Sequence, residues 1–362
     1  MNSQPLPIKI NNIIIPPEFA QILQQKTLNS IARKFVFTAI NNFLNRCDRG
    51  YFTIVGSPGS GKSTILARYI TENPETFYYS AIVSGKNRAE EFLKSTSAQV
   101  EAVDGTSLQI ILQQISDQLQ PNQKFIIVID SLDAIDYSIQ AVGSNLFYLP
   151  RYLPKGIYFL LARRPFVKEK SGLLIEAPSQ YFNLKDYPKE NRQDIKTYIQ
   201  QYLKEFLPSP SVIQERFGIN QEEFIQQLSD RSENNFMYVS QILTAIKNDF
   251  YLENSSLTDI FNSNTFPDAL ETYYQQHLQK MFPAEQGEDF NSNAQAVLNI
   301  LVKNLSPVSV EEISEIIDVD EYDVEEILED WIEFLNINQI EGENCYSLYH
   351  QSFREWLIRT NM

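Results

Sequence analysis

A glycine-rich stretch near residue 60 has the residue types and spacing of a phosphate-binding loop. Gly56 to Ser63 fits the pattern G-x-x-x-x-G-K-[ST] in full, and it lies between a predicted strand and a predicted helix, as this loop requires. Glycines let backbone N–H groups turn toward phosphate oxygens, and the helix N-terminus adds a favourable dipole. In this pattern the lysine contacts the β- and γ-phosphates and the serine binds Mg²⁺. The predicted nucleotide-binding residues are Gly56, Ser57, Pro58, Gly59, Ser60, Gly61, Lys62, Ser63 and Thr64.

Two carboxylates follow a second apolar segment and suit a metal ion and a water molecule. Residues 125–129 predict a buried strand, and Asp130 stands at its carboxyl end, where an acid can face a metal ion at the phosphate loop. We therefore expect Ser63 and Asp130 to hold Mg²⁺. Asp133, three residues later, can polarise the water that attacks the γ-phosphate. In the simpler alternative, Asp133 only begins a turn or a helix.

Two arginines end a third apolar segment. Residues 157–161 predict a strand, and Ala162-Arg163-Arg164-Pro165 follows it. Because parallel strands bring their carboxyl ends to one edge of the sheet, this strand delivers two cations to the edge that holds the phosphate loop. One of them can sense the γ-phosphate. The alternative is that both arginines lie on the surface in solvent.

Bringing these residues together requires a parallel sheet covered by helices. The predicted strands are residues 51–55, 77–83, 125–129 and 157–161, and the predicted helices are residues 28–45, 88–100, 107–119 and one that begins near Lys62. Strands that alternate with helices favour an α/β fold. Pro5, Pro7, Pro16 and Pro17 exclude a continuous helix over residues 1–25, so an extended arm is predicted there.

The second half of the chain predicts helices and one hairpin. Helical spacing covers residues 194–206, 221–228, 236–246, 294–303, 310–317 and 321–335, and a further helix ends at Met281 with Pro267 in its first turn. Residues 336–340 and 345–349 predict two strands around a turn at Gly342. Three helices and a hairpin are typical of a winged helix. The predicted domains are an arm (1–29), a nucleotide-binding domain (30–170), a helical domain (171–290) and a winged helix (291–362).

Charge is distributed unevenly along the chain, whose formal net charge is -16. Residues 1–170 carry a net charge of +5 and residues 171–362 a net charge of -21, and the stretch from Asn304 to Phe353 has fourteen acids and no Lys or Arg. Such a surface repels nucleic acid and anionic membranes, so neither partner is expected. The acidic face either attracts the other half or a neighbouring subunit, or is simply solvated.

The remaining composition indicates a cytoplasmic protein. No apolar run approaches the roughly 18 residues that span a bilayer, and residues 1–9 have no signal-peptide pattern. Cys47 and Cys345 are far apart and have no metal-type spacing, so we expect two reduced thiols.

Taken together, the motifs resemble the STAND class of signal-transduction ATPases, close to its NACHT and NB-ARC groups, over about residues 30–358. Ala32-Arg33-Lys34-Phe35 resembles the short G-R motif that precedes the first strand. The other similar segments are Gly56–Thr64 and residues 130–133 (Walker A and B), 162–165 (T-S-R-P), 232–238 (G-N-F-L-Y), 266–270 (L-P-x-x-L) and 349–357 (H-x-S-F-x-E-F-L). The implied fold is an α/β P-loop NTPase sheet of AAA+/STAND type, followed by an all-α domain and a C-terminal winged helix.

The resemblance also implies roles for single residues. Arg33 would help to hold adenine, Arg164 would sense the γ-phosphate, and His350 would contact the β-phosphate of ADP in a closed state. It implies a switch that binds ATP or ADP with Mg²⁺, hydrolyses ATP slowly, forms a homo-oligomer when ATP-bound and signals to an effector or sensor protein. Taken alone, His350 would be an ordinary packed histidine, and we expect the same of His277.

The sequence also departs from this family. Ala32 replaces the glycine of the G-R motif, and Asn234 replaces the glycine before Asn235. Ala134 stands where an acid often follows Asp133, which argues against fast hydrolysis. No effector domain is recognised before residue 30 and no sensor repeats after residue 358, so the chain is either a bare switch core or a piece of a longer protein.

Two alternative functions remain. A DNA-acting AAA+ ATPase of the origin-binding type also pairs a P-loop domain with a winged helix. Its recognition helix would be residues 321–335, which together with Asp320 carry eight acids and no Lys or Arg, the wrong sign for a DNA groove. The other alternative is a scaffold that binds nucleotide without hydrolysing it.

Overall fold

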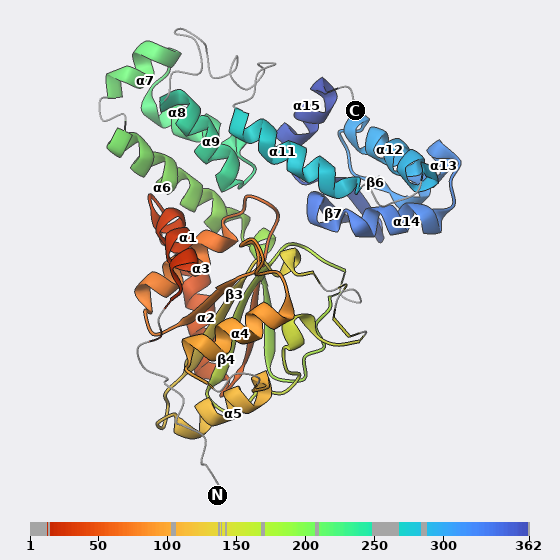
Figure 1. Cartoon of the computed structure of the whole chain (residues 1–362). Helices are drawn as coiled ribbons and strands as arrows, with labels where there is room; N and C mark the ends of the chain where they lie inside the picture. Colours follow the sequence, from red (N-terminus) through yellow and green to blue (C-terminus); the bar gives the residue numbers. More distant parts are fainter. Residues whose placement is uncertain are drawn as a thin grey trace, which may run out of the picture. The chain divides into compact units, whose positions relative to one another are not determined.

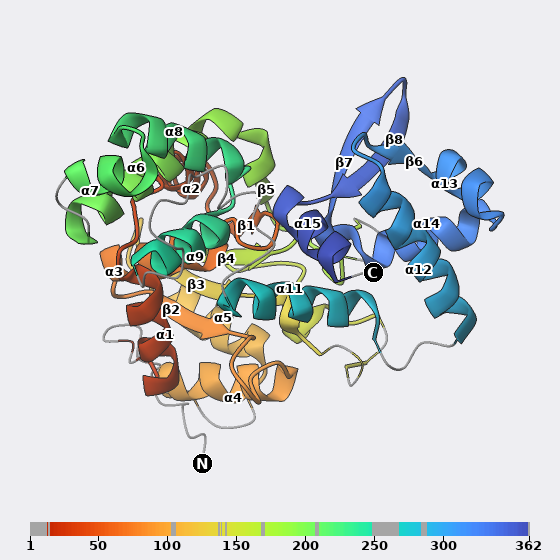
Figure 2. The ribbon, with the colours of Figure 1, turned by 90° about the horizontal axis from the view of Figure 1, so that it is seen from above.

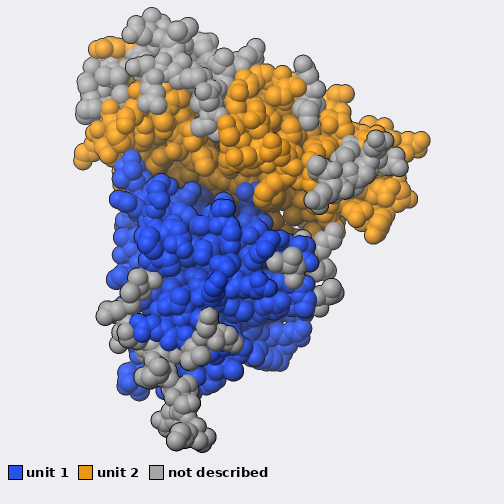
Figure 3. All heavy atoms as spheres, viewed as in Figure 1, with its two compact units in different colours: residues 1–56, 61–164, 168–190 blue, residues 57–60, 165–167, 191–362 orange. Residues whose placement is uncertain are grey.

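The computed structural model describes residues 13 and 15–360, apart from residues 103–105, 137, 139, 142, 168–170, 207–209, 248–267 and 284–287. The chain forms two compact units (Figure 3). The first comprises residues 1–56, 61–164 and 168–190, and the second comprises residues 57–60, 165–167 and 191–362. The tip of the glycine-rich loop therefore groups with the second unit.

The first unit is built on a parallel sheet of five strands in the order β2-β3-β4-β1-β5 (Figure 2). The strands are β1 (Gly50–Val55), β2 (Phe77–Ser80), β3 (Phe125–Asp130), β4 (Ile157–Arg163) and β5 (Ser179–Asn183). The predicted α/β fold with a parallel sheet is thus confirmed. Strand β4, which ends at Arg163, therefore lies between the strand that leads into the phosphate loop and the strand that ends at Asp130.

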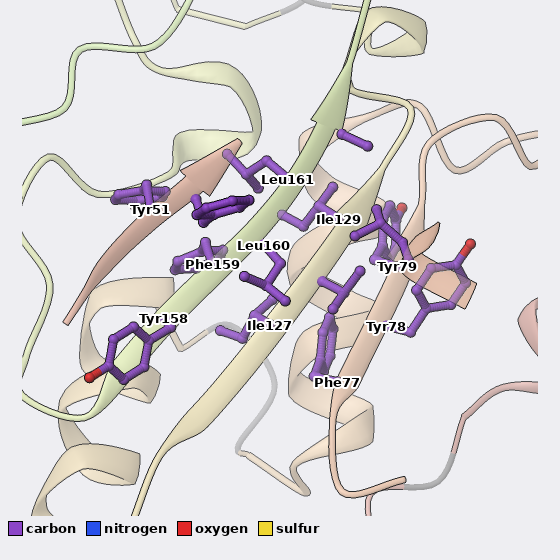
Figure 4. Close-up of a cluster of buried hydrophobic side chains, with 14 of the residues drawn as sticks. Tyr51, Phe77, Tyr78, Tyr79, Ile127, Ile129, Tyr158, Phe159, Leu160 and Leu161 are labelled. Carbon is purple, nitrogen blue, oxygen red and sulfur yellow. The ribbon is translucent and has the colours of Figure 1, made fainter. Parts of the chain in front are cut away.

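Strands β1, β3 and β4 are apolar because both of their faces are covered. Every residue of β1 and β4 is buried, and in β3 only Ile126 is half-buried. A strand covered on both faces needs apolar side chains at every position, which explains the continuous runs in the sequence. Figure 4 shows Tyr51 of β1 beside Phe159 of β4, and their rings stack with centroids 5.0 Å apart.

Helices surround this sheet (Figures 1 and 2). They are α1 (Pro17–Thr27), α2 (Lys34–Arg46), α3 (Lys62–Glu72), α4 (Ala89–Gln99) and α5 (Leu108–Gln118). The predicted helices over residues 88–100 and 107–119 agree closely with α4 and α5. Helix α2 begins at Lys34 rather than at Leu28.

The prediction of an extended arm over residues 1–25 is wrong from residue 17 onward, and residues 1–12 and 14 lie outside the described residues. Pro16 is the N-cap of α1 and Pro17 its first residue, a position where a helix needs no N–H donor and the proline ring fits. Phe19 is fully buried, with its ring edge-on to Tyr78 and Tyr79 of β2. Two adjacent prolines thus start a helix here.

Strand β5 was not predicted. It is an edge strand that pairs with β1, and only Phe182 of its five residues is buried. Its sequence, Ser-Gln-Tyr-Phe-Asn, therefore lacks the apolar run that revealed the central strands, and the prediction that strand signals end near residue 165 missed it.

The second unit is mainly helical. Helix α6 (Pro188–Phe206) leads into it, and α7 (Pro210–Phe217), α8 (Gln221–Arg231), α9 (Phe236–Lys247) and α11 (Asp268–Met281) follow. Helices α6, α8, α9 and α11 match the predicted helical segments, whereas α7 was not predicted. The predicted first-turn position of Pro267 lies outside the described residues. No helix in the described part of the chain is long and apolar enough to span a membrane.

The C-terminal segment contains the predicted three helices and hairpin. Its elements are α12 (Glu288–Lys303), β6 (Val308–Ser309), α13 (Val310–Ile317), α14 (Glu321–Asp330), β7 (Leu335–Ile340), β8 (Glu343–Leu348) and α15 (Gln351–Arg359). Strands β6, β8 and β7 form an antiparallel sheet. Helix α14 ends before the predicted residue 335, because Leu335 already pairs with Leu348 in this sheet.

Candidate nucleotide-binding site

The glycine-rich loop connects β1 to α3 in the form that the sequence predicted. Gly61, the residue before α3, has a φ of 88°, and Gly59 has a φ of 79°. Both values lie in the left-handed region that side chains disfavour, so glycine is required at these two positions. The Nζ of Lys62, the first residue of α3, donates a hydrogen bond of 2.6 Å to the Gly56 carbonyl. The loop therefore brings its cation and the N-terminus of α3 to one place.

Ser63 and Asp130, the two predicted Mg²⁺ ligands, are in contact. The Ser63 hydroxyl donates to Asp130 Oδ1 over 3.1 Å. Asp130 is 2% exposed, and its burial raises the pKa of the carboxyl group, while the hydrogen bond from Ser63 acts in the opposite direction. A buried carboxylate and a hydroxyl are oxygen donors of the kind that Mg²⁺ prefers.

Mg²⁺ at a phosphate loop needs few protein ligands. The ion usually keeps several waters and takes further oxygens from the phosphates. Within the described ranges, no group of three or more His, Cys, Asp or Glu side chains is arranged to hold a metal. Ser63 and Asp130 satisfy this smaller requirement, and they would be the two protein ligands of the ion.

Asp133 and Arg164, the two predicted catalytic residues, form an ion pair. Asp133 lies in a short 3-10 turn (Leu132–Ala134) after β3, and Arg164 follows β4. The Nε of Arg164 is 3.1 Å from Asp133 Oδ2, and the backbone N–H of Arg164 donates to Asp133 Oδ1 over 3.1 Å. Both side chains are about four-fifths buried. In this structure, each carboxylate oxygen of Asp133 is therefore engaged by Arg164.

The neighbouring Arg163 has a different environment. Its side chain is 7% exposed, and its guanidinium donates to the Ser171 carbonyl over 2.8 Å. Burial lowers the pKa of this arginine. The predicted pair of arginines thus separates into Arg163, which is tied to the loop after β4, and Arg164, which pairs with Asp133.

Arg33 is buried and lies just before α2. It is the N-cap residue of that helix, and its guanidinium lies over the ring of Phe35, 5.2 Å from the ring centroid. It is 3% exposed. Its predicted contact with adenine remains a prediction.

Lys26 is a charged residue near Asp130 that the sequence analysis missed. It lies in the last turn of α1, and its positive charge lowers the pKa of Asp130, as does that of Lys62. Recognising the Pro16-Pro17 pair as a helix start would have replaced the predicted arm with a helix that carries this lysine.

The loop tip contacts the start of α9 within the second unit. The N–H groups of Phe236 and Met237 donate to the Gly59 carbonyl over 2.9 and 3.2 Å. The Asn235 side chain donates to the Pro58 carbonyl over 3.2 Å. A Cβ on Gly59 would lie 2.1 Å from the Asn235 side-chain oxygen. The close contact between these two residues therefore also requires glycine at position 59. The sequence resemblance included residue 235 but gave it no role.

His350 is 1% exposed and forms hydrogen bonds within the second unit. It is the N-cap of α15, where its Nδ1 accepts from the Ser352 backbone N–H over 3.1 Å. Its Nε2 is 2.9 Å from the Ser232 carbonyl. Burial lowers the pKa of His350 to about 4, although the bond to Ser232 acts in the opposite direction. Whether His350 contacts a phosphate remains a prediction.

His277, the other histidine, is also buried, and its Nδ1 lies 3.0 Å from the Tyr349 hydroxyl. A separate cleft of about 550 Å³ in the first unit is lined by residues 93, 107–109, 143–145 and 148–152. None of the predicted site residues lines this cleft, so it is distinct from the phosphate loop.

The strand, glycine-rich loop, helix and buried acid define a P-loop nucleotide-binding domain. Residues 46–164 match the family model described as an AAA domain. No curated protein matches the sequence.

Three solved structures match most of this chain at low sequence identity and with TM-scores below 0.5. The chain is 12% identical to the Aeropyrum pernix ORC2 protein (TM-score 0.43; 97% of this chain and 96% of that chain covered). It is 12% identical to a chain of Drosophila ORC bound to DNA (TM-score 0.41; 94% and 98%). It is also 16% identical to a STAND protein with a tetratricopeptide repeat sensor from Pyrococcus horikoshii (TM-score 0.38; 99% and 44%). At these TM-scores, the likenesses do not decide between the functions of these proteins.

Proposed function

We propose that the chain binds ATP and ADP with Mg²⁺ at residues 56–64 and acts as a nucleotide-controlled switch of the STAND class. The observation that carries this proposal is the hydrogen bond between Ser63 and Asp130. It places a hydroxyl and a buried carboxylate, from elements 67 residues apart, beside the loop that would hold the phosphates. Burial disfavours the charged form of Asp130, and a metal ion bound there would stabilise that form.

The remaining loop residues would bind the phosphates. Lys62 would exchange its hydrogen bond to the Gly56 carbonyl for phosphate oxygens, which are stronger acceptors for an ammonium group. The N-terminus of α3 would stabilise the negative charge. The chemistry that Mg²⁺ supplies when bound is the neutralisation of charge that develops on the transferred phosphoryl group.

Hydrolysis is expected to be slow because Asp133 is paired with Arg164. Each oxygen of this carboxylate contacts Arg164, so the ion pair competes with an attacking water molecule for Asp133. Arg164 would have to leave Asp133 and turn to the γ-phosphate before Asp133 could take a proton from water. Exchange of this ion pair for a phosphate contact would make turnover dependent on the bound nucleotide.

The ATP-bound form is proposed to form a homo-oligomer and to signal to an effector or sensor protein. The exposed side of α14 supports a protein partner over a nucleic acid, because Glu321, Asp323, Glu325, Glu326 and Asp330 are exposed there. A helix with this charge repels phosphate groups. The DNA-binding alternative would therefore require DNA to bind against the repulsion of this acidic surface.

Titration of a fluorescent ADP analogue, together with a phosphate-release assay, tests the proposed function. Lys62→Ala should weaken nucleotide binding by about 10- to 150-fold, because charge-assisted hydrogen bonds are lost. Light scattering should show a larger particle with ATP than with ADP. Binding without phosphate release would support the scaffold alternative, and fluorescence anisotropy with a labelled DNA duplex would test the DNA alternative. Absence of nucleotide binding by the wild-type chain would refute the proposal.

A further inference from the structure

Three backbone N–H groups at the start of α9 need acceptors. The first residues of a helix have no partner within the helix. Here the groups of Phe236 and Met237 donate to the Gly59 carbonyl, and that of Tyr238 donates to the Asn235 side-chain oxygen over 3.1 Å. The phosphate-loop tip is thus an acceptor for the N-terminus of α9.

Asn235 has two functions in this contact. Its side-chain oxygen caps α9, and its amide nitrogen donates to the Pro58 carbonyl over 3.2 Å. The residue is 5% exposed. An aspartate or serine at this position would keep the cap acceptor, but neither has the amide donor that reaches Pro58.

The turn before Asn235 is strained, and two hydrogen bonds to the Ser232 carbonyl stabilise it. Glu233 and Asn234 have φ values of 46° and 66°, which cost energy for residues other than glycine. The Asn235 N–H closes this turn by donating to the Ser232 carbonyl over 2.7 Å. The same carbonyl is the partner of His350 Nε2.

The tautomer of His350 follows from its contacts. Because the Ser352 backbone N–H can only donate, Nδ1 must carry a lone pair, and the proton of the neutral ring lies on Nε2. His350 therefore donates to the Ser232 carbonyl. The hydroxyl of Tyr274 contacts the Ser352 hydroxyl, which lies 2.6 Å from His350 Nδ1. A continuous set of hydrogen bonds thus runs from Tyr274 to the loop tip.

We propose that Asn235 is a positioning residue of the phosphate loop, and that His350 acts on nucleotide affinity through Ser232 and Asn235. This inference rests on the proposed nucleotide binding. It gives His350 an indirect role, because the ring nitrogen that would donate to a phosphate already donates to the Ser232 carbonyl. The Asn235 amide fixes the carbonyl of Pro58, and the first N–H groups of α9, the helix that Asn235 caps, fix the carbonyl of Gly59. Together these contacts orient the N–H groups of the loop toward the phosphates.

A double-mutant cycle on ADP affinity tests this proposal. Asn235→Ser keeps the helix cap but removes the donor to Pro58, and it should weaken ADP and ATP binding by about 3- to 10-fold, the range of one hydrogen bond. His350→Ala should weaken binding less, and it should have no further effect in the Asn235→Ser background, because both changes disturb the same contact. The thermal midpoint without nucleotide should differ little between Asn235→Ser and the wild type.

Each remaining outcome is decisive. Unchanged affinity in Asn235→Ser would overturn the positioning role, and additive losses would show that His350 acts independently, as a direct phosphate contact would. If Asn235→Ser does not fold, Asn235→Asp provides the same cap, and faster hydrogen exchange of residues 57–62 in that variant without nucleotide is the expected result. Unchanged exchange would overturn the proposal. A wild-type chain that binds no ADP would instead refute the proposed function.

Discussion

Asp130 in the first unit and His350 in the second are both almost fully buried, yet their surroundings differ. Burial shifts the pKa of each group toward its neutral form. The ring of His350 meets neutral partners on both nitrogens, Ser232 and Ser352. Asp130 lies among the charges of Lys26, Lys62 and Asp133. A buried group surrounded by neutral hydrogen-bond partners is suited to holding a structure in place, whereas a buried acid that contacts a hydroxyl group, as Asp130 contacts Ser63, is suited to binding a metal ion.

The largest expected effect comes from Asp130→Asn. The amide can still accept a hydrogen bond from Ser63, but it is a poor ligand for Mg²⁺. Phosphate release should fall by at least about 100-fold, and Mg²⁺ should no longer strengthen ATP binding. Because a buried negative charge is removed, the thermal midpoint without nucleotide should rise by a few degrees. A phosphate-release assay measures the first effect, and calorimetry with and without Mg²⁺ measures the change in ATP binding and in the thermal midpoint. A lower midpoint would contradict the view that burial of this charge is costly.

Asp133→Asn should slow hydrolysis by about 100-fold, the lower end of the usual contribution of a general base. Nucleotide affinity should change by less than about 3-fold, because Asp133 contacts Arg164 rather than the loop. Single-turnover phosphate release and ADP titration on the same preparation separate the two quantities. An equal loss of affinity and rate would show that Asp133 and Asp130 do not have separate roles.

His350 should make stability depend on pH. Its pKa of about 4 in the folded chain lies below the ordinary value of 6.5, so the unfolded chain binds a proton first. The stabilisation is complete above pH 6.5 and is lost as pH falls toward 4. Between pH 7.5 and 5.5 the wild type should lose about 1.4 kcal/mol of unfolding free energy relative to His350→Gln, which does not titrate. Urea unfolding at each pH measures the unfolding free energy of the two proteins. If the two free energies change by the same amount with pH, the prediction is wrong.

The smallest effect is expected from Lys26→Ala. Removing this charge should raise the pKa of Asp130 further, and it should weaken binding of the negatively charged Mg²⁺–ATP complex by about 2- to 3-fold at low salt. Because Lys26 is exposed, the difference should disappear at high ionic strength. Lys94→Ala is the matched control, since Lys94 is 71% exposed and pairs with Glu91. An equal effect of both changes would assign the result to net charge alone.

The sequence predicted the parts of the fold whose signals are local. Strands β1, β3 and β4 are continuous apolar runs, and the loop from Gly56 to Ser63 has a specific pattern, so both were found. Strand β5 was missed because only Phe182 is buried, and α1 was missed because its prolines were taken to exclude a helix rather than to begin one.

Apart from one contact, the pairs of distant residues that meet in the structure could not be predicted from the sequence. The contact between Ser63 and Asp130 follows from the pattern of the domain. The pairing of Asp133 with Arg164 and the approach of Asn235 to Gly59 depend instead on how strands and turns bring side chains together. Each contact joins residues that are more than 30 positions apart and have no fixed spacing.

The strand order has a consequence for the growing chain on the ribosome. Strand β1 pairs only with β4 and β5 among the described strands, so about 100 residues must be synthesised after it before its first partner exists. During this interval, at about 5–20 residues per second, a segment that is fully buried in the folded chain has no hydrogen-bonded neighbouring strand. A nascent chain that ends at residue 150 would contain the glycine-rich loop and Asp130, yet it would lack β4, which lies between β1 and β3 in the sheet. We expect such a truncated chain to bind chaperones and to aggregate when released.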